Sequence, residues 1–569
     1  MSTDIYNVTE TRIDPDVECN IRMLMLPMRD GVKLQTQIAF PVDMPEKAPV
    51  VLIRTPYCRR TWFELPDAVA LKRGCVFIMQ AVRGTAFSKG EFLPEDAEIH
   101  RNDTEDLLNY LETQSWFNGR CVMYGGSFSG YMQWCAAWSG KDCLKAVSPR
   151  VAPMYGCRSA ARPGGGAALG FCCNWVMAMY YRCRKGYNNQ PDLNALDLWS
   201  KLPVVDFDKT VFGHEVPNFR KFIKSARTPG KVLKEHQRWF KEFKTPAFIT
   251  GGWFDLFKQE TIESYQLMRQ YGKTEKAREF SRVTIGPWGH SGLLSPEIFG
   301  AENNYDEMRK KETNFLYGLL ENPEQDPISD YPKVNFFMLG ENRWHSVDNW
   351  PPAGGEDQEF YLHSNGNANS CRGDGRLDTL PAAEDEACDV YVSDPRNPVS
   401  ASGKRNSAYS FHDRKLIHQQ QDVLVYSTEV LKEDLTIAGN VKLAFYAEIS
   451  TPDTDFFATL TDVHPDGKAY AFTSGMLRAR FADSLEEEKL IEPGTVKRFE
   501  IDLGDIAIKF KAGHRMKLDI CGQNYPVFDR NANTGKPLFA DKELLPCTVK
   551  IFHDAGHPAV LTLPVNEHC

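Results

Sequence analysis

The sequence predicts an α/β chain with a parallel sheet at its centre, a helical insertion within that part, and an antiparallel β domain at the end. Three observations point to this arrangement. Short apolar strands alternate with helices in the first 150 residues, and the same rhythm resumes after residue 244. A stretch rich in helical patterns separates these two parts, and short alternating segments dominate after residue 352. With 569 residues, the chain has the length of roughly 3 to 4 domains.

The first part of the chain supplies the predicted sheet. Strands are expected over residues 48–54, 75–80, 120–124 and 144–148, and helices over residues 67–72 and 103–111. The second of these helices carries acidic residues in its expected first turn, as the helix macrodipole favours. Continuous apolar strands that alternate with helices indicate a parallel sheet covered on both faces.

The later elements divide the chain further. Helices are expected over residues 171–181, 231–244 and 305–320, and strands over residues 246–250 and 282–286. After Trp350-Pro-Pro352, alternation over residues 441–446, 456–460 and 516–521 is typical of an antiparallel sandwich, and a jelly roll is the expected form. We therefore expect a core over residues 1–155 and 244–351, a helical cap over residues 156–243, and a jelly-roll domain over residues 352–569.

Composition limits the function classes. The net charge of −9, from 67 Lys and Arg against 76 Asp and Glu, disfavours general binding to a phosphate backbone, so we expect no nucleic-acid partner. No apolar run approaches the ~18 residues that span a bilayer, and the polar, acidic N-terminus does not resemble a signal peptide. The 15 cysteines are scattered and include no C-x-x-C pair, which favours reduced thiols. We expect a cytoplasmic protein with no membrane partner.

The motif that carries the chemistry follows the expected strand at residues 120–124. It reads Gly125-Gly-Ser-Phe-Ser-Gly130 and leads into a helix. A strand, a Gly-x-Ser turn and a helix form the nucleophile elbow of α/β hydrolases, in which a tight turn projects Ser127 from the sheet. Glycines at the two ends let strand and helix approach each other, and the Phe128 amide at the helix N-terminus faces a developing oxyanion. The alternative is a βα loop without a catalytic role.

A serine nucleophile needs a base, and the base needs an orienting carboxylate. In α/β hydrolases the order along the chain is serine, acid, histidine. The strand at 246–250 leads into Asp255, and the strand at 282–286 leads into His290. Ser127, Asp255 and His290 each lie just beyond the carboxyl end of a strand, which is the edge where open α/β sheets place their sites. A purely structural histidine, and an aspartate that only caps a helix over residues 258–271, are the alternatives.

Short motifs along most of the chain carry a family resemblance. They are Met28-Arg-Asp-Gly-Val32, Arg54-Thr-Pro-Tyr57, Val82-Arg-Gly84, Ser88-Lys-Gly-Glu-Phe92, the elbow, Gly252-Trp-Phe-Asp255, Gly286-Pro-Trp-Gly-His290, Asp422-Val-Leu-Val-Tyr426, Asp453-Thr-Asp-Phe456, Asp462-Val-His-Pro-Asp-Gly467, Gly513-His-Arg515 and Phe528-Asp-Arg530. In this order they resemble the CocE/NonD hydrolase family, the cocaine esterase-like branch of the X-Pro dipeptidyl-peptidase-like α/β hydrolases.

The resemblance implies an α/β-hydrolase core with an inserted helical cap and a C-terminal β jelly-roll domain. It also implies roles by position. Ser127 would be the nucleophile, His290 the general base and acid, and Asp255 the residue that orients the histidine. The Tyr57 hydroxyl would complete an oxyanion hole with the Phe128 amide.

Two aromatic positions are implied as lining of the acyl pocket, namely Trp175 and Phe257, with core packing as the alternative for each. Trp253 and Trp288 flank the triad in sequence, and core packing is the favoured interpretation for both. The chain departs from the family at Gln80-Ala81, where the family usually carries Gln-Asp. The loss of that carboxylate affects the hydrogen bonds of the loop that follows and leaves the triad intact.

These observations predict a serine hydrolase that cleaves a carboxylic ester of a small molecule through an acyl-enzyme. An amide substrate, an acyltransferase, an X-Pro dipeptidyl-peptidase-type amidase and, last, a non-catalytic binding protein are the alternatives. We expect no cofactor and no metal, since His553-Asp-Ala-Gly-His557 lies in the β domain with a glycine between its histidines. The sequence leaves the oligomeric state open, a homo-oligomer included.

Overall fold

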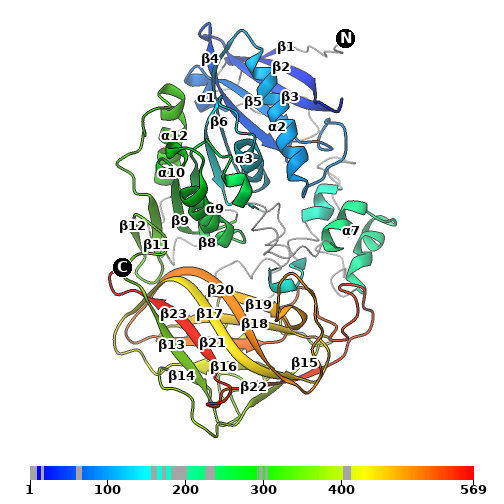
Figure 1. The fold of residues 1–569 in the computed structure, drawn as a ribbon, viewed down its shortest axis with the longest axis vertical. Coiled ribbons are helices and arrows are strands. Elements are labelled where there is room, and N and C mark those ends of the chain that lie inside the picture. The colour runs from blue at the N-terminus through cyan, green and yellow to red at the C-terminus, as the bar shows by residue number, and fades with distance from the viewer. Residues whose placement is uncertain are drawn as a thin grey trace.

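The structure is a computed structural model. It describes residues 9–13, 18–58, 67–154, 163–169, 175–180, 201–224, 237–290, 292–293, 299–300, 305–400 and 412–569. An α/β part, coloured blue to green, is stacked on a β-rich part coloured mostly yellow to red (Figure 1). This confirms the expected fold class.

The described strands of the α/β part form one sheet. They are β1 (Thr9–Ile13), β2 (Glu18–Pro27), β3 (Lys33–Pro41), β4 (Ala48–Thr55), β5 (Val76–Ala81), β6 (Phe117–Gly126), β7 (Leu144–Arg150), β8 (Phe248–Phe254), β9 (Arg282–Gly289), β10 (Gly292–Leu293), β11 (Val334–Met338) and β12 (Arg343–Val347). Their order is β1-β2-β3-β5-β4-β6-β7-β8-β9-β11-β12, with β10 beside β9. From β5 to β11 along this order all neighbours are parallel.

The edges of this sheet differ from the expected all-parallel arrangement. β1, β2 and β3 are antiparallel to their neighbours, and so is β12. A tight turn joins β2 to β3, in which the Met28 amide donates to the Val32 carbonyl at 2.8 Å. Because so short a connection can join only antiparallel strands, the hairpin sets the direction of this edge.

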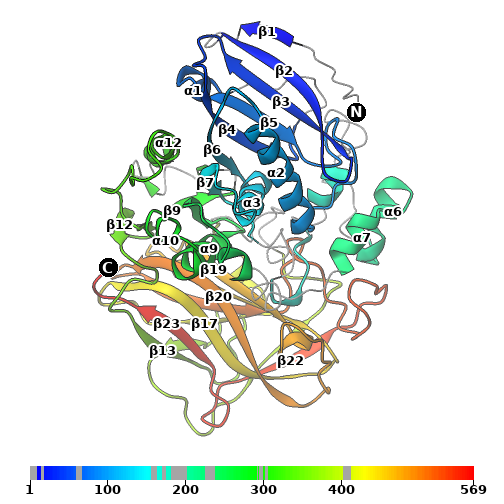
Figure 2. The same ribbon diagram turned by 45° about the horizontal axis from the view of Figure 1, so that its top comes forward.

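Helices cover both faces of the sheet. The longer described helices are α1 (Ala68–Lys72), α2 (Ala97–Glu112), α3 (Phe128–Trp138), α6 (Phe207–Phe212), α7 (Pro217–Lys224), α9 (Lys258–Tyr271), α10 (Glu275–Glu279) and α12 (Tyr305–Glu321). Alternate side chains of the central strands point to opposite faces. Val51 and Val122 pack with α1 and α12, whereas Leu52 and Met123 pack with α2 and α3. Figure 2 shows α2 and α3 side by side, in agreement with their contacts.

Helix α2 begins six residues earlier than the sequence predicts. Asp96 precedes it and accepts a hydrogen bond from the Ile99 amide at 3.1 Å, so the helix starts at Ala97. The expectation that the acidic residues from 103 onward lie in its first turn is therefore wrong. Asp103 is instead buried in the middle of the helix, where its carboxylate accepts two hydrogen bonds from Arg83 at 2.5 and 3.1 Å.

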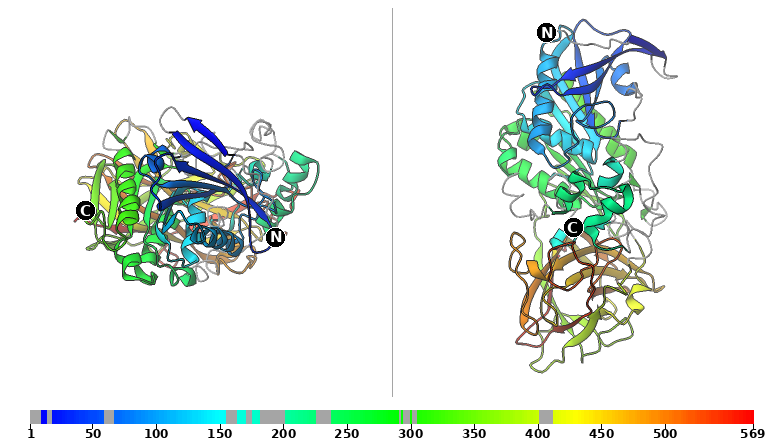
Figure 3. Two further views of the ribbon diagram at one scale, coloured as in Figure 1. Left: turned by 90° about the horizontal axis from the view of Figure 1, so that it is seen from above. Right: turned by 90° about the vertical axis from the view of Figure 1, so that its right-hand side faces the viewer.

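The described residues of the expected cap are mainly helical. Residues 175–180, α6, α7 and residues 237–240 are helical, while residues 241–244 are not. The other residues of the helices expected over 171–181 and 231–244 lie outside the described part of the chain. Figures 1 and 3 show α6 and α7, in blue-green, at one side of the molecule near the level where its two parts meet.

The C-terminal part is the expected β domain, and its described strand pairs are antiparallel except for β14 with β16. Its strands are β13 (Glu356–His363), β14 (Arg376–Asp378), β15 (Asp389–Ser393), β16 (Val423–Ser427), β17 (Leu435–Ile449), β18 (Asp455–Val463), β19 (Ala469–Arg478), β20 (Val496–Phe510), β21 (Arg515–Cys521), β22 (Cys547–Phe552) and β23 (Val560–Val565). Among the described strands their order is β15-β22-β17-β23-β13-β14-β16-β21-β18-β19, with β20 beside β17. β20 also contacts α9 and β11, which joins this domain to the α/β part.

None of the helices in the described ranges is long and apolar enough to cross a bilayer.

Candidate active site

Ser127 lies on a sharp turn between β6 and α3. Its backbone has φ 56° and ψ −129°, a conformation that side-chain-bearing residues adopt only under constraint. Hydrogen bonds impose that constraint. The Ser127 amide donates to the Arg150 carbonyl at 2.8 Å, and the Ser127 carbonyl accepts from the amides of Gly130 and Tyr131 at 2.8 and 3.1 Å. The local geometry is that of a nucleophile elbow.

The glycines that flank this turn are required because a side chain at either position would clash with a neighbouring residue. A Cβ atom at Gly125, where φ is +146°, would lie 2.8 Å from the Cβ atom of Ser129. At Gly130 it would lie 2.4 Å from the Cβ atom of Ala152. The two glycines therefore let α3 approach the sheet closely enough for the turn to form.

The three residues that the sequence singles out are in hydrogen-bond contact. His290 Nε2 lies 3.1 Å from Ser127 Oγ, and His290 Nδ1 lies 2.7 Å from Asp255 Oδ1. The Asp255 side chain is completely buried, whereas the His290 side chain is 30% exposed. This arrangement places a proton acceptor beside the serine hydroxyl, and a carboxylate that favours the imidazole with its proton on Nδ1.

Asp255 also organises the start of α9. Its Oδ2 atom accepts a hydrogen bond from the Phe257 amide at 3.2 Å, and its carbonyl accepts one from the Lys258 amide at 3.1 Å. The two interpretations of Asp255 from the sequence, as the residue that orients His290 and as a cap of the following helix, are thus compatible. One carboxylate oxygen contacts the imidazole, and the other contacts the backbone that leads into the helix.

Tyr57 lies beside the serine. It follows the end of β4, and its hydroxyl donates a hydrogen bond to Ser127 Oγ at 3.3 Å. Thr55 Oγ1 accepts hydrogen bonds from the Tyr57 amide at 3.2 Å and from the Ser129 hydroxyl at 2.8 Å, which ties the tyrosine to the elbow. The Phe128 amide is the first of α3, so no carbonyl within the helix accepts from it. Two donors are therefore available next to the nucleophile.

The sheet explains why residues so distant in sequence meet. Ser127, Asp255 and His290 are each the first residue after a strand, namely β6, β8 and β9. These strands and β4 belong to one parallel run, so their carboxyl ends lie along the same edge. The observed strands β8 and β9 extend to Phe254 and Gly289, beyond the ends expected from sequence.

The two implied pocket aromatics pack against the site residues. The Trp175 ring stacks on the Phe128 ring, with centroids 5.5 Å apart. The buried Phe257 ring meets the His290 imidazole at 5.5 Å in an edge-to-face arrangement. Both side chains therefore border the site and also contribute to packing. Trp253 and Trp288 are buried, as core packing predicts.

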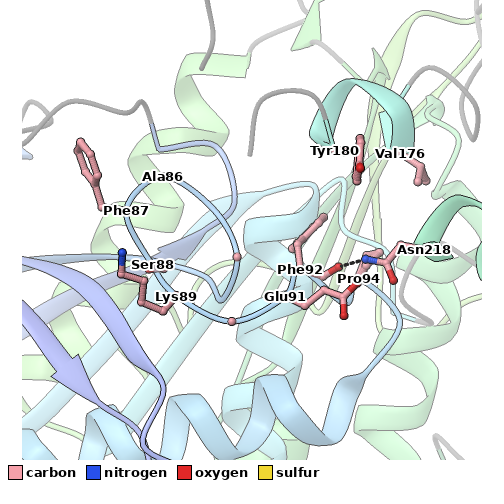
Figure 4. A pocket seen from close by; sticks show the side chains of 12 residues that line it. Ala86, Phe87, Ser88, Lys89, Glu91, Phe92, Pro94, Val176, Tyr180 and Asn218 are labelled. Carbon is pink, nitrogen blue, oxygen red and sulfur yellow. Dashed lines mark hydrogen bonds between the residues drawn. The ribbon is translucent and has the colours of Figure 1, made fainter. Parts of the chain in front are cut away.

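A cavity of about 560 Å³ lies beside Phe92, whose ring centroid is 6.0 Å from that of Trp175 (Figure 4). The loop from Gly84 to Pro94 lines it, together with Val176 and Tyr180 from the helical residues 175–180 and Asn218 from α7. Asn218 Nδ2 donates to the Phe92 carbonyl at 2.7 Å, and the Phe92 ring lies 5.5 Å from the Phe128 ring. The Ser88-Lys-Gly-Glu-Phe92 motif is part of this wall, a role that sequence reasoning did not assign.

The departure at Gln80-Ala81 is accommodated locally. The Ala81 carbonyl accepts a hydrogen bond from Ser88 Oγ at 2.8 Å, and Ser88 Oγ in turn accepts from the Gln35 amide at 2.8 Å. The Gln80 side chain accepts from Arg54 Nε at 2.7 Å. Backbone and neutral side-chain groups, together with the ion pair of Arg83 and Asp103, thus hold the loop that follows β5.

Two family models match most of the chain. The family model of the X-Pro dipeptidyl-peptidase (S15 family) matches residues 30–292, and that of the X-Pro dipeptidyl-peptidase C-terminal non-catalytic domain matches residues 327–561. The cocaine esterase of Rhodococcus sp. (strain MB1 Bresler) is 30% identical over 95% of this chain and 98% of its own length.

Solved structures share the whole fold. An α-amino acid ester hydrolase superposes with a TM-score of 0.81 over 100% of both chains at 23% identity. A CocE/NonD family hydrolase from Staphylococcus aureus superposes with a TM-score of 0.66 at 18% identity, over 96% of this chain and 94% of its own.

Proposed function

The chain belongs to the CocE/NonD hydrolase family, the cocaine esterase-like branch of the X-Pro dipeptidyl-peptidase-like α/β hydrolases, and is a serine hydrolase that acts on esters; from this premise we propose that Ser127, His290 and Asp255 form its catalytic triad. The observation that carries the proposal is the unbroken series of hydrogen bonds from Asp255 Oδ1 through His290 to Ser127 Oγ.

In the first half of the reaction, Ser127 Oγ attacks the acyl carbon of the ester while its proton passes to His290 Nε2. Asp255 stabilises the imidazolium that forms. The carbonyl oxygen becomes an oxyanion, and the Tyr57 hydroxyl and the Phe128 amide donate hydrogen bonds to it. When the tetrahedral intermediate collapses, the ester C–O bond breaks, the alkoxide takes the proton from His290, and an acyl-enzyme remains.

In the second half, a water molecule takes the place of the alcohol. His290 removes a proton from the water as its oxygen attacks the acyl carbon, and then returns the proton to Ser127 Oγ as the carboxylic acid leaves. The same two hydrogen-bond donors stabilise the second oxyanion. Trp175 and Phe257 border the space available to the acyl group, which favours an apolar acyl chain.

The charges of the described cap residues favour an ester over an X-Pro peptide or an amino acid ester. An enzyme that binds a substrate ammonium needs carboxylates available near the site. Among the described cap residues, Asp208 accepts hydrogen bonds from Arg220 at 2.8 and 2.9 Å, and Asp206 accepts one from Arg220 at 2.8 Å. Because Arg220 already pairs with both carboxylates, we propose a small neutral acyl ester as the substrate.

We also propose that the enzyme acts in the cytoplasm, without nucleic acid, membrane or cofactor. The cysteine usage supports the cytoplasmic location, since Cys75, Cys121, Cys135 and Cys143 are present as buried thiols. Burial raises the pKa values of Cys75, Cys135 and Cys143 to about 12, which keeps these thiols protonated and unreactive.

Active-site labelling tests the triad. Wild-type protein should react with a fluorophosphonate probe and hydrolyse short-chain aryl esters, and Ser127→Ala should do neither. Ser139→Ala, at the far end of α3, is the matched control and should label as wild type does. His290→Ala should lose turnover yet keep its melting temperature within a few degrees. An unlabelled wild-type protein that turns over no aryl ester, amino acid ester or X-Pro amide would refute the proposal.

Product analysis separates the remaining alternatives. With an ester substrate and an added alcohol or amine, a hydrolase releases the free acid, whereas an acyltransferase forms the new ester or amide. Faster cleavage of X-Pro amides than of neutral esters would favour the peptidase alternative.

A further inference from the structure

Three potential metal ligands meet at one end of β18 in the C-terminal domain, separate from the triad. Asp462 lies near the end of β18, His464 in the turn that follows, and His514 directly before β21. The sheet holds them together, because β18 and β21 are paired with Asp462 opposite Met516 and Val463 opposite Arg515. The turn is fixed by a hydrogen bond from the His464 amide to the Lys468 carbonyl at 2.9 Å.

The side-chain atoms of this cluster converge on one point. Asp462 Oδ1 and Oδ2 lie 2.9 and 3.0 Å from His514 Nδ1, and Asp462 Oδ2 lies 3.3 Å from His464 Nε2. The two imidazole rings are 4.4 Å apart. One ligand atom from each of the three residues lies within 4.8 Å of the other two. Ligands about 2.0–2.1 Å from a zinc ion are separated by roughly 3.3 Å in a tetrahedron, so small rotations would suffice to bind one ion.

Asp462 is a buried carboxylate with no arginine among its ion-pair partners, a property that it shares with Asp389, which pairs with His553. Asp462 is only 1% exposed, and its carboxylate is paired with the imidazoles of His464 and His514. Four other buried aspartates are paired with arginines: Asp453 with Arg480, Asp455 and Asp529 with Arg478, and Asp519 with Arg414. A buried carboxylate needs a compensating positive charge. At Asp462 either a protonated histidine or a bound cation can supply it.

We propose that Asp462, His464 and His514 bind one divalent transition-metal ion, Zn²⁺ being the ion that this ligand set fits best. Two imidazoles and one carboxylate suit zinc, whereas Ca²⁺ and Mg²⁺ prefer oxygen ligands alone. Because a metal ion binds deprotonated imidazole nitrogens and a carboxylate, its binding releases any proton held at those atoms. The His464 side chain is 35% exposed, so an ion can enter from solvent and keep a water as its fourth ligand. The ion would fasten the β18–β19 turn to the start of β21.

Metal binding by the full-length protein tests this site. Protein stripped with a chelator and then equilibrated with Zn²⁺ should bind one ion per chain, measured by calorimetry and elemental analysis, and its melting temperature should rise. Co²⁺ should give visible d–d bands without the near-ultraviolet band of a thiolate ligand, which excludes binding through cysteine. Ca²⁺ and Mg²⁺ should not bind.

The variants make the assignment specific. His464→Ala leaves the Asp462–His514 contact in place and is the variant least disruptive to folding. It should weaken Zn²⁺ binding by at least about tenfold, as should Asp462→Asn. The control is His557→Ala, which removes an imidazole outside the cluster that is hydrogen-bonded to Asp554. This variant should bind Zn²⁺ as wild type does. Less than one ion per five wild-type chains at saturating Zn²⁺, or equal affinity in His464→Ala and wild type, would overturn the proposal.

Discussion

The hydroxyl of Ser127 is positioned by two side chains from different parts of the chain. His290 Nε2 lies 3.1 Å away on one side, and the Tyr57 hydroxyl lies 3.3 Å away on the other. The first contact supplies a base. The second supplies a hydrogen-bond donor, the Tyr57 hydroxyl, which can donate to the substrate oxygen when that oxygen becomes negatively charged. At the scale of single residues, the proposed chemistry therefore separates into proton transfer and charge stabilisation.

Tyr57→Phe tests the second of these contributions. Removal of one oxyanion donor is expected to lower kcat by about 10²–10³-fold, since the hydrogen bond strengthens only as the oxyanion forms. KM should change little. Tyr361→Phe, which loses a surface hydrogen bond to Glu359, is the control. A large rise in KM with unchanged kcat would show that Tyr57 binds substrate instead.

At the scale of elements, the elbow requires α3 to approach the sheet closely. Gly130 faces Ala152 across this contact, and a Cβ atom at position 130 would come within 2.4 Å of the Ala152 Cβ atom. The backbone fixes the position of each Cβ atom, so neither can move away without a displacement of α3 or of the segment after β7.

Gly130→Ala is therefore expected to lower the free energy of unfolding by about 1–3 kcal/mol. The double variant Gly130→Ala with Ala152→Gly should recover most of that loss, because it removes the atom that clashes. Urea unfolding measures both. If the second substitution restores nothing, backbone conformation rather than this contact determines the effect.

Helix α9 carries a partly buried lysine into the contact with the β domain. Lys258 Nζ donates a hydrogen bond to Thr473 Oγ1 at 3.1 Å. Burial lowers the pKa of Lys258 from 10.5 to about 8, although Asp505 and Asp502 favour its charged form. Below pH 8 the folded protein bears the full penalty of holding the partly desolvated Lys258 ammonium. As pH rises from 8 to 10.5 the folded state releases this proton before the unfolded state does, so the penalty fades.

Lys258→Met should be more stable than wild type at pH 7, by about 2 kcal/mol. The pKa shift corresponds to roughly 3 kcal/mol, and about 1 kcal/mol is lost with the hydrogen bond. This advantage should vanish by pH 10, as measured by urea unfolding at several pH values. Lys310→Met, on the surface of α12, controls for the removal of a lysine. An advantage that stays constant between pH 7 and pH 10 contradicts the interpretation.

At the scale of the whole molecule, contacts between backbone and buried polar groups join the two parts. The Leu339 amide beyond β11 donates to the Ala507 carbonyl of β20 at 3.1 Å, and Trp350 Nε1 donates to Asp505 Oδ1 at 2.7 Å. Asp529 of the β domain accepts a hydrogen bond from the Ala167 amide at 2.7 Å. These contacts involve residues on several elements, so we expect the two parts to unfold together.

Asp529→Ala tests this coupling. The carboxylate also accepts from Arg478 at 3.0 Å, so its loss should lower the free energy of unfolding by about 2–3 kcal/mol. Wild type and variant should each show one urea transition by circular dichroism. Asp554→Ala, near the surface, is the control. Two separate transitions in the wild-type protein would contradict cooperative unfolding.

The sequence carried enough information for the central strands and the site residues. Apolar runs marked β4, β5, β6 and β7 to within a few residues, because strands buried on both faces are apolar throughout. It did not reveal the antiparallel edge from β1 to β3, whose direction depends on a hairpin. It also did not reveal the cluster of Asp462, His464 and His514, since β18 and β21 meet only through their register in the sheet.

By itself, the sequence determined that a serine on a strand–turn–helix motif would be followed by an acid and a histidine at strand ends, because these are local patterns of residue type and spacing. Only the tertiary structure decided that these groups form one series of hydrogen bonds, which runs from the Asp255 carboxylate through the His290 imidazole and the Ser127 hydroxyl to the Tyr57 hydroxyl. The physical reason is that parallel pairing aligns the carboxyl ends of β4, β6, β8 and β9 at one edge, and no short stretch of sequence encodes that alignment.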